Sequence, residues 1–161
     1  MSPQDRWPPR CADFFAGRIV QIDYGSNAVR LLQTSPRLAT SIPIQMNYNA
    51  MCVPVTVDGN RLNRVRVDTG CDQPLHVSTT SLSAVERTKE KRSSIGLSKG
   101  ATLLRHCGIQ LGGLSIGNFP TTFHLRPIFP NEDGLLGNRA LSEFIMTIDM
   151  RKRRLILESK S

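Results

Sequence analysis

The 161-residue chain has few aromatic residues, few cysteines and no long apolar run, and each shortage argues against a class of protein. No stretch approaches the roughly 18 consecutive apolar residues of a membrane-spanning helix. Aromatic residues make up 6% of the chain and do not alternate with its basic residues, as a nucleic-acid-binding surface would require. Apolar residues still account for 39% and charged residues for 21%. This composition indicates one folded domain with one core.

The cysteines do not form the pattern of a disulfide framework. They are few and widely spaced, and no Cys-x-x-Cys occurs: Cys11, Cys52, Cys71 and Cys107. We therefore expect buried free thiols in a reducing compartment. His106-Cys107 is the one neighbouring His/Cys pair, and no metal-ligand spacing surrounds it, so we predict no metal site and no cofactor. No secretory signal is visible in residues 1–10, which favours the cytoplasm.

The charge is positive, with 21 Lys and Arg against 13 Asp and Glu, for a net charge of +8. The densest basic run, Arg151-Lys-Arg-Arg154, is interpreted as a solvated hairpin turn. A basic nucleic-acid-binding β domain remains a third hypothesis, and we consider nucleic acid an unlikely partner.

Short strands separated by turn residues predict an all-β fold with three parts. Residues 1–12 are proline-rich and irregular, residues 13–35 form a hairpin, and residues 43–158 form the main lobe. The clearest hairpin joins residues 51–57 and 61–67 through Asp58-Gly59, a pair that favours a type I′ turn.

The second half of the chain is predicted to contain short strands and little helix. Strands are expected at 101–104, 108–111, 114–116, 121–125, 145–149 and 155–157, with turns at Gly112-Gly113 and Gly117-Asn118. A short helix is expected over residues 81–90, and Asn138 is expected to cap another that continues to about Phe144.

Two hairpins of the chain match each other at a constant spacing of 126 residues. Ile19-x-x-Ile-Asp23 corresponds to Ile145-x-x-Ile-Asp149, and Phe15, Val29 and Leu31 correspond to Leu141, Leu155 and Leu157. We interpret this match as an internal repeat, in which residues 14–32 resemble the last hairpin of a second lobe. The alternative is chance similarity between two hairpins.

Asp68-Thr69-Gly70 is the segment most suited to chemistry. A strand carries Asp68, and Gly70 permits a sharp turn in which backbone amides approach the carboxylate. Two such carboxylates placed together share a proton and can activate a water molecule. Alone, the tripeptide is also compatible with an ordinary polar turn.

The order of motifs resembles the retropepsin-like aspartic proteases over residues 43–158. A hairpin precedes Asp68-Thr69-Gly70, and Leu135-Leu136-Gly137 follows about 65 residues later, before a short helix and a final hairpin. The resemblance implies a closed all-β barrel lobe with one short helix near the C-terminus. It also implies that the Asp-Thr-Gly loop and Leu135-Leu136-Gly137 lie side by side.

The resemblance also implies roles for single residues. Asp68 would be the catalytic aspartate, Thr69 would hydrogen-bond to a partner's loop, and Gly70 would form the tight turn. Residues 93–107, with Gly96 and Gly100, would form a flap over a peptide substrate. Cys71 departs from the Ala or Ser that is commoner there, and we expect it to be buried.

The sequence therefore predicts an aspartic endopeptidase whose two aspartates come from two lobes or from a homodimer. Its substrate would be a peptide or protein. The alternative is a catalytically inactive binding or dimerisation module of the same fold, because the chain holds a single Asp-Thr-Gly.

Overall fold

The computed structural model describes residues 15–37, 39–82 and 102–160. The described chain is almost entirely β-structure. Its strands are β1 (Ile19–Asp23), β2 (Ala28–Leu31), β3 (Thr40–Pro43), β4 (Gln45–Asn47), β5 (Ala50–Val57), β6 (Asn60–Asp68), β7 (Leu75–Ser78), β8 (Thr102–Leu111), β9 (Leu114–His124), β10 (Gly134–Gly137), β11 (Phe144–Asp149) and β12 (Arg154–Ser159). A 3₁₀ turn, η2 (Thr79–Ser81), follows β7, and the α-helix α3 (Asn138–Leu141) follows β10. None of the helices among these residues is long or apolar enough to cross a membrane.

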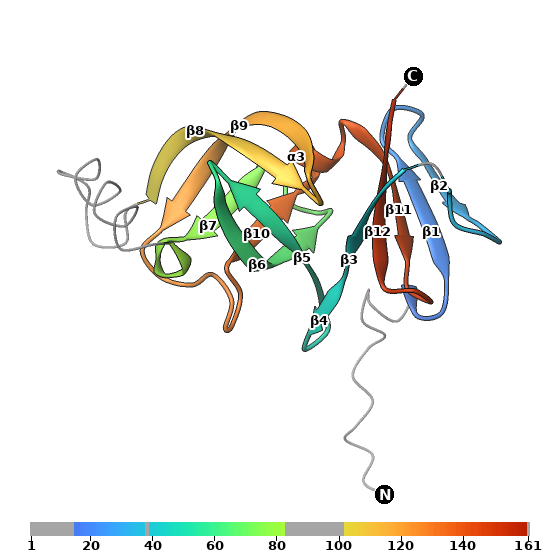
Figure 1. Cartoon of the computed structure of the whole chain (residues 1–161), viewed down its shortest axis with the longest axis horizontal. Helices are drawn as coiled ribbons and strands as arrows, with labels where there is room; N and C mark the ends of the chain where they lie inside the picture. The colour runs from blue at the N-terminus through green and yellow to red at the C-terminus, as the bar shows by residue number, and fades with distance from the viewer. Residues whose placement is uncertain (1–14, 38, 83–101, 161) are drawn as a thin grey trace, which may run out of the picture.

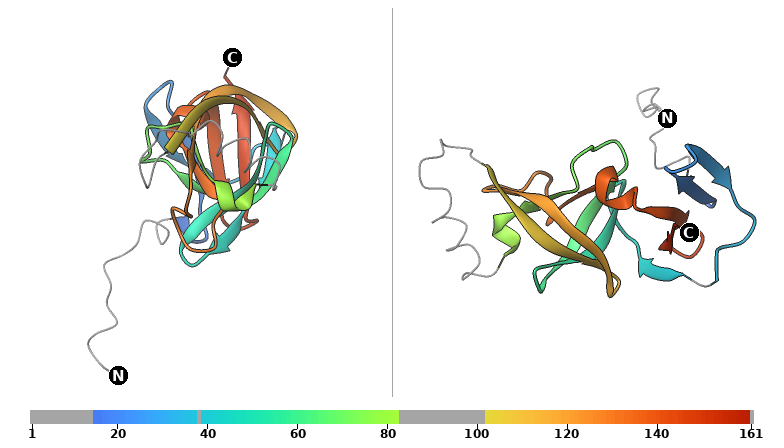
Figure 2. Two further views of the ribbon diagram at one scale, coloured as in Figure 1. Left: turned by 90° about the vertical axis from the view of Figure 1, so that its left-hand side faces the viewer. Right: turned by 90° about the horizontal axis from the view of Figure 1, so that it is seen from above.

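The larger sheet closes into a barrel (Figure 1). Its order is β4-β5-β6-β10-β7-β9-β8, and an additional pairing of β5 with β8 joins its two sides. Figure 2 shows the closed barrel in its left-hand view. The prediction of an all-β closed barrel with one short helix near the C-terminus is therefore confirmed.

Alternating apolar residues explain the first strands of the barrel. Along β5, Val53, Val55 and Val57 are buried, and the β5–β6 register shifts between Val53 and Val55, on either side of Pro54. Proline has no N–H for the strand ladder, so a shift there loses no further hydrogen bond. Asp58 and Gly59 both have positive φ, 46° and 83°, which confirms the predicted type I′ turn.

One predicted break between strands and one predicted turn in the second half of the barrel are wrong. Residues 102–111 and 114–124 form two long strands, so the break expected between 104 and 108 does not occur. Gly117, expected in a turn, lies inside β9 with φ +129°, where the register to Ile109 shifts. A glycine inside a strand marks a bulge as readily as a turn. The turn at Gly112 and Gly113 is confirmed.

The helix near the C-terminus is shorter than predicted and has a different cap. Gly137 is its N-cap and Asn138 its first residue, and β11 already begins at Phe144. Asn138 lies one residue past the cap position, and its side-chain nitrogen donates to Thr69 O. Of the predicted helix over residues 81–90, only the first two residues are described, and Ser81 ends a 3₁₀ turn.

The second sheet has the order β2-β1-β11-β12-β3 and lies beside the barrel (Figures 1 and 2). The hairpin predicted over residues 19–32 is present, since Val20 pairs with Leu31 and Ile22 with Val29, and it extends this sheet along β11. Both sheets contribute to one apolar core. Its fully buried members include Ile42, Leu62, Leu75, Phe123, Leu136, Met146 and Leu155.

Candidate active site

Asp68 ends strand β6, directly beside the last residue of β10. The two strands run parallel, with Leu136 opposite Val67 and Gly137 opposite Asp68. β10 also pairs antiparallel with β7 on its other side. The arrangement implied by the resemblance, in which the two motifs lie side by side, is therefore present. It places the end of the Asp68 strand at the start of α3.

Gly137 allows the loop after Asp68 to pack directly on β10. A Cβ at this position would lie 1.9 Å from Gln73 O and 2.7 Å from Cys71 O, so no side chain fits. The backbone fixes the same contact: Gly137 N donates to Pro74 O at 3.0 Å, and Asn138 N donates to Cys71 O at 2.8 Å. The absence of a side chain thus brings two backbone segments together and sets the position of the loop.

The Asp68 carboxylate is held through one of its oxygens. Gly70 N donates to Asp68 Oδ1 at 2.9 Å, and Cys71 N donates to Asp68 O at 3.3 Å. Within the described part of the chain, Oδ2 accepts no hydrogen bond, and Asp68 is partly exposed. One oxygen is therefore oriented by the loop, and the other is open to a water molecule, a substrate or a second carboxylate.

Thr69 points away from the interior of its own lobe. Its side chain is exposed and makes no hydrogen bond within the described residues, while its carbonyl oxygen accepts from Asn138 Nδ2 at 3.3 Å. Asn138 was predicted as a helix cap and not as a residue of the site. Its position directly after Leu135-Leu136-Gly137 is the signal that could have shown it.

Two acidic residues anchor the start of β10 against β6. Asp133 Oδ2 accepts from Asn63 N and Arg64 N, both at 2.9 Å. The buried Glu132 accepts two hydrogen bonds from Arg66, from Nε at 2.7 Å and from a terminal nitrogen at 2.8 Å. These bonds raise the pKa of Arg66. Together they fix where β10 enters the sheet, and with it the register of Gly137 against Asp68.

The described cysteines are free thiols in different settings. Cys52 and Cys107 are buried, as predicted, and burial raises the pKa of Cys52 to about 11. Cys71 is half-buried rather than buried, because it lies in the loop at the rim of the site. Cys11 lies outside the described residues. No group of three or more metal-binding side chains occurs in the described ranges.

The described site is incomplete in two respects. No second carboxylate is hydrogen-bonded to Asp68 within the described residues. Of the flap predicted over residues 93–107, Gly96 and Gly100 lie outside the described residues, and residues 102–107 belong to barrel strand β8. Asp68, Thr69 and Gly70 are brought together as one exposed loop.

Comparisons with known protein families and with curated proteins found no match to this chain. Among solved structures, the chain is similar to a retropepsin-like aspartic protease from Rickettsia conorii. The two share 20% sequence identity with a TM-score of 0.47, over 77% of this chain and 96% of the other. It is also similar to Basic 7S globulin from soybean, with 10% identity and a TM-score of 0.49, over 89% of this chain. The chain spans 52% of the globulin.

The closed barrel, the short helix and the pairing of β6 with β10 define the class of this fold. It is an all-β closed-barrel lobe with one short helix near its C-terminus, the architecture that the resemblance implied.

Proposed function

We propose that this protein is an aspartic endopeptidase in which Asp68 supplies one of two catalytic carboxylates. The observation that carries the proposal is the pairing of Gly137 with Asp68, which presents a carboxylate at the end of a barrel strand with one oxygen held by Gly70 N and the other open. A rigidly placed carboxylate with a free oxygen is what a general base requires.

The reaction would need two carboxylates and one water molecule. The ionised carboxylate takes a proton from the water as the water oxygen attacks the carbonyl carbon of the scissile peptide bond. The protonated carboxylate donates a hydrogen bond to the carbonyl oxygen, and a tetrahedral intermediate forms. The C–N bond then breaks, the leaving nitrogen takes a proton, and a carboxyl group and an amine are released. No step requires a metal or an organic cofactor.

The second carboxylate would come from a second lobe or subunit that presents an equivalent loop. The exposed Thr69 side chain is free to hydrogen-bond to that loop, while Asn138 holds the Thr69 carbonyl oxygen from behind. Such a contact between two loops would hold the carboxylates at a fixed separation. In this proposal, a lobe with a single aspartate is inactive until a second loop faces it.

A cleavage assay with matched variants tests the assignment. The full chain is incubated over a range of concentrations with a denatured protein substrate, and new peptide termini are counted by mass spectrometry. We expect the rate per molecule to rise with concentration, because two loops are needed. Asp68→Asn should abolish cleavage, while Asp72→Asn, an exposed acid in the same loop, should retain it. Retention of the wild-type rate by Asp68→Asn would overturn the proposal.

A further inference from the structure

The five-stranded sheet has an outer face that is turned away from the barrel. Along β12, Leu155 and Leu157 belong to the core shared with the barrel, so the alternating Arg154 and Ile156 lie on the outer face. Cross-strand partners share a face, and the pairing across the sheet adds three more residues to this one: Ser41, Asp149 and Ile19.

The connector between β2 and β3 is tied to one end of this outer face. β2 and β3 are the two edge strands of the sheet, so the connector passes from one edge to the other. Ser35 Oγ in the connector donates to Asp149 Oδ2. Arg151, in the turn after β11, donates from Nη1 to Gln33 O at 3.5 Å and from Nε to Gly17 O at 3.0 Å. The connector is thus held at two points.

A pocket of about 620 Å³ lies between the connector, the turn after β11 and the outer face of the sheet. Pockets that hold small organic ligands measure roughly 300–1,000 Å³. Four basic residues line it, one from the connector, two from the turn and one from β12: Arg37, Arg151, Lys152 and Arg154. Among the described residues, Asp149 is the one acidic residue of the lining.

The protein does not pair these four cations with carboxylates. Within the described ranges, none of them forms an ion pair. Asp149 is 0% exposed, and its oxygens accept from Ser35 Oγ and from Lys152 N, the latter at 3.0 Å. Its carboxylate therefore holds the connector and the turn in place. Like charges around one pocket repel each other, and a bound anion would relieve that repulsion.

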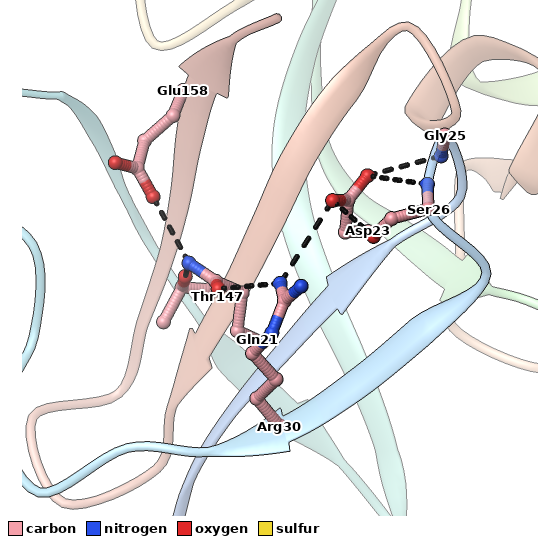
Figure 3. Close-up of polar contacts among 7 residues, drawn as sticks. All are labelled: Gln21, Asp23, Gly25, Ser26, Arg30, Thr147 and Glu158. Atoms are coloured by element: carbon pink, nitrogen blue, oxygen red, sulfur yellow. Dashed lines mark hydrogen bonds and ion pairs between the residues drawn. The ribbon is translucent and has the colours of Figure 1, made fainter.

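The charges at the other end of the same face are arranged differently. There Arg30 Nη1 lies 3.8 Å from Asp23 Oδ2, and Gln21 Nε2 donates to Glu158 Oε2 at 3.3 Å (Figure 3). Acidic and basic side chains balance each other at that end. The excess of positive charge on the described part of this face therefore lies at the pocket.

The pocket also offers apolar surface and hydroxyl groups. Ile19 and Ile156 form part of its lining and are 4% and 5% exposed, and Ser41 and Thr34 place hydroxyl groups beside them. Guanidinium groups bind phosphate oxygens through two parallel hydrogen bonds, and hydroxyl groups donate to the same oxygens. An apolar floor beside such groups suits a ligand that has an apolar or ring-shaped body as well as a phosphate.

We propose that this pocket binds a small phosphorylated molecule with a ring-shaped body, such as a nucleotide. The phosphates would lie among Arg37, Lys152 and Arg154, and the ring would pack against Ile19 and Ile156. The pocket faces away from the barrel that carries Asp68, so the proposal is independent of the proposed function. A bound ligand would join the connector to the turn after β11 and so stabilise the folded chain.

The first test titrates the full chain by calorimetry with three probes: ATP, inorganic tripolyphosphate and adenosine. We expect one ATP to bind per chain, at least about tenfold more tightly than either of the other probes, because each of those occupies one half of the pocket. An equal affinity for tripolyphosphate and ATP would show that the apolar floor takes no part. That result, or no binding of ATP, would overturn the proposal.

The second test separates the pocket from the general positive charge of the chain. Lys152→Gln/Arg154→Gln removes two charges from the pocket, and the control Arg61→Gln/Arg64→Gln removes two from exposed positions in β6. We expect the pocket variant to weaken ATP binding at least about tenfold and the control to change it no more than about twofold. Equal weakening by both variants would overturn the proposal.

The third test fills the pocket without a change of charge. Ser41→Trp places a large side chain in it, and Ser115→Trp, at an exposed position of β9, is the matched control. ATP should raise the melting temperature of the parent and of Ser115→Trp but not that of Ser41→Trp. Undiminished ATP binding by a folded Ser41→Trp protein would overturn the proposal; if this variant does not fold, the charge variants decide. Cleavage is not measured in any of these tests, so the pocket and the role of Asp68 can fail independently.

Discussion

Gly137 and Gln73 lie so close that a Cβ on residue 137 would meet Gln73 O at 1.9 Å. This contact joins the loop after Asp68 to the strand beside it. The placement of the proposed catalytic carboxylate therefore depends on the absence of a side chain one strand away. Neither β6 nor β10 alone would fix it.

We expect Gly137→Ala to destabilise the fold by about 3 kcal/mol, because the backbone must move to accept the methyl group. Gly108 is the matched control, since a Cβ there makes an ordinary contact, 3.6 Å from the nearest heavy atom. Gly108→Ala should change stability by no more than about 0.5 kcal/mol. Urea unfolding of both variants measures the difference. Equal stabilities would show that the loop is not packed as described.

The Arg66–Glu132 pair should couple strongly in a double-mutant cycle. Glu132 is 5% exposed and accepts two hydrogen bonds from Arg66, so Arg66→Met leaves a buried, partly unpaired carboxylate. We expect Arg66→Met to lower the free energy of unfolding by about 3 kcal/mol. The double variant Arg66→Met/Glu132→Leu should recover part of that loss. If the losses of Arg66→Met alone and of Glu132→Leu alone add up to the loss of the double variant, the pair does not anchor β10.

Stability should fall on acidification through the His76–His124 pair. His76 Nδ1 and His124 Nε2 lie 2.8 Å apart, and burial lowers the pKa of both rings. The neighbouring His76 lowers the pKa of His124 further, while Asp72 acts in the opposite direction on His76. The unfolded chain therefore binds these protons more readily. The stabilisation by the neutral histidines is complete above their pKa in the unfolded chain, about 6.5, and is lost as the pH falls below it.

Thermal melts between about pH 7.5 and pH 5 measure this effect. His124→Gln should flatten the dependence of the melting temperature on pH, while the exposed His106→Gln should leave it unchanged. If the melting temperatures of the parent, His124→Gln and His106→Gln proteins depend equally on pH, the histidine pair is not the cause of that dependence.

Cleavage should be fastest on the acid side of neutral and should be inhibited by a statine-type compound. One of the two carboxylates must hold a proton, and raising the pH removes it. The acid side is also where the histidine pair weakens the fold, so we expect the rate to fall again at low pH. A rate that climbs steadily to about pH 9, or that a metal chelator abolishes, would indicate another mechanism.

The sequence predicted the parts of the fold that depend on local pattern. Asp58-Gly59 specified its own turn, and alternation specified the strands on either side. Gly117 was misplaced in a turn, because only the partner strand shows that it lies at a bulge. The role of Asn138 was misjudged for a similar reason, since its side chain donates to Thr69 O, 69 residues earlier in the chain.

The repeat was visible in the sequence, but its meaning was not. The match between residues 19–23 and 145–149 does not show that the two strands pair. Nor does it show that Gln21 lies opposite Thr147, the residue that corresponds to it in the repeat. The contrast between the bare Val29 and the buried Leu155 exists only in the folded chain. Equivalent positions of the repeat differ in burial because tertiary packing covers only one of them.

The rate of peptide cleavage by the full chain and by its Asp68→Asn variant tests the catalytic assignment most directly. We predict that the unsubstituted chain, at a concentration at which two copies associate, cleaves a denatured protein substrate. Asp68→Asn should lower the rate at least about 100-fold, because the substitution removes the carboxylates that act as general base and general acid. Asp72→Asn, in the same loop, should leave the rate unchanged. Cleavage at the parent rate by Asp68→Asn would contradict the account.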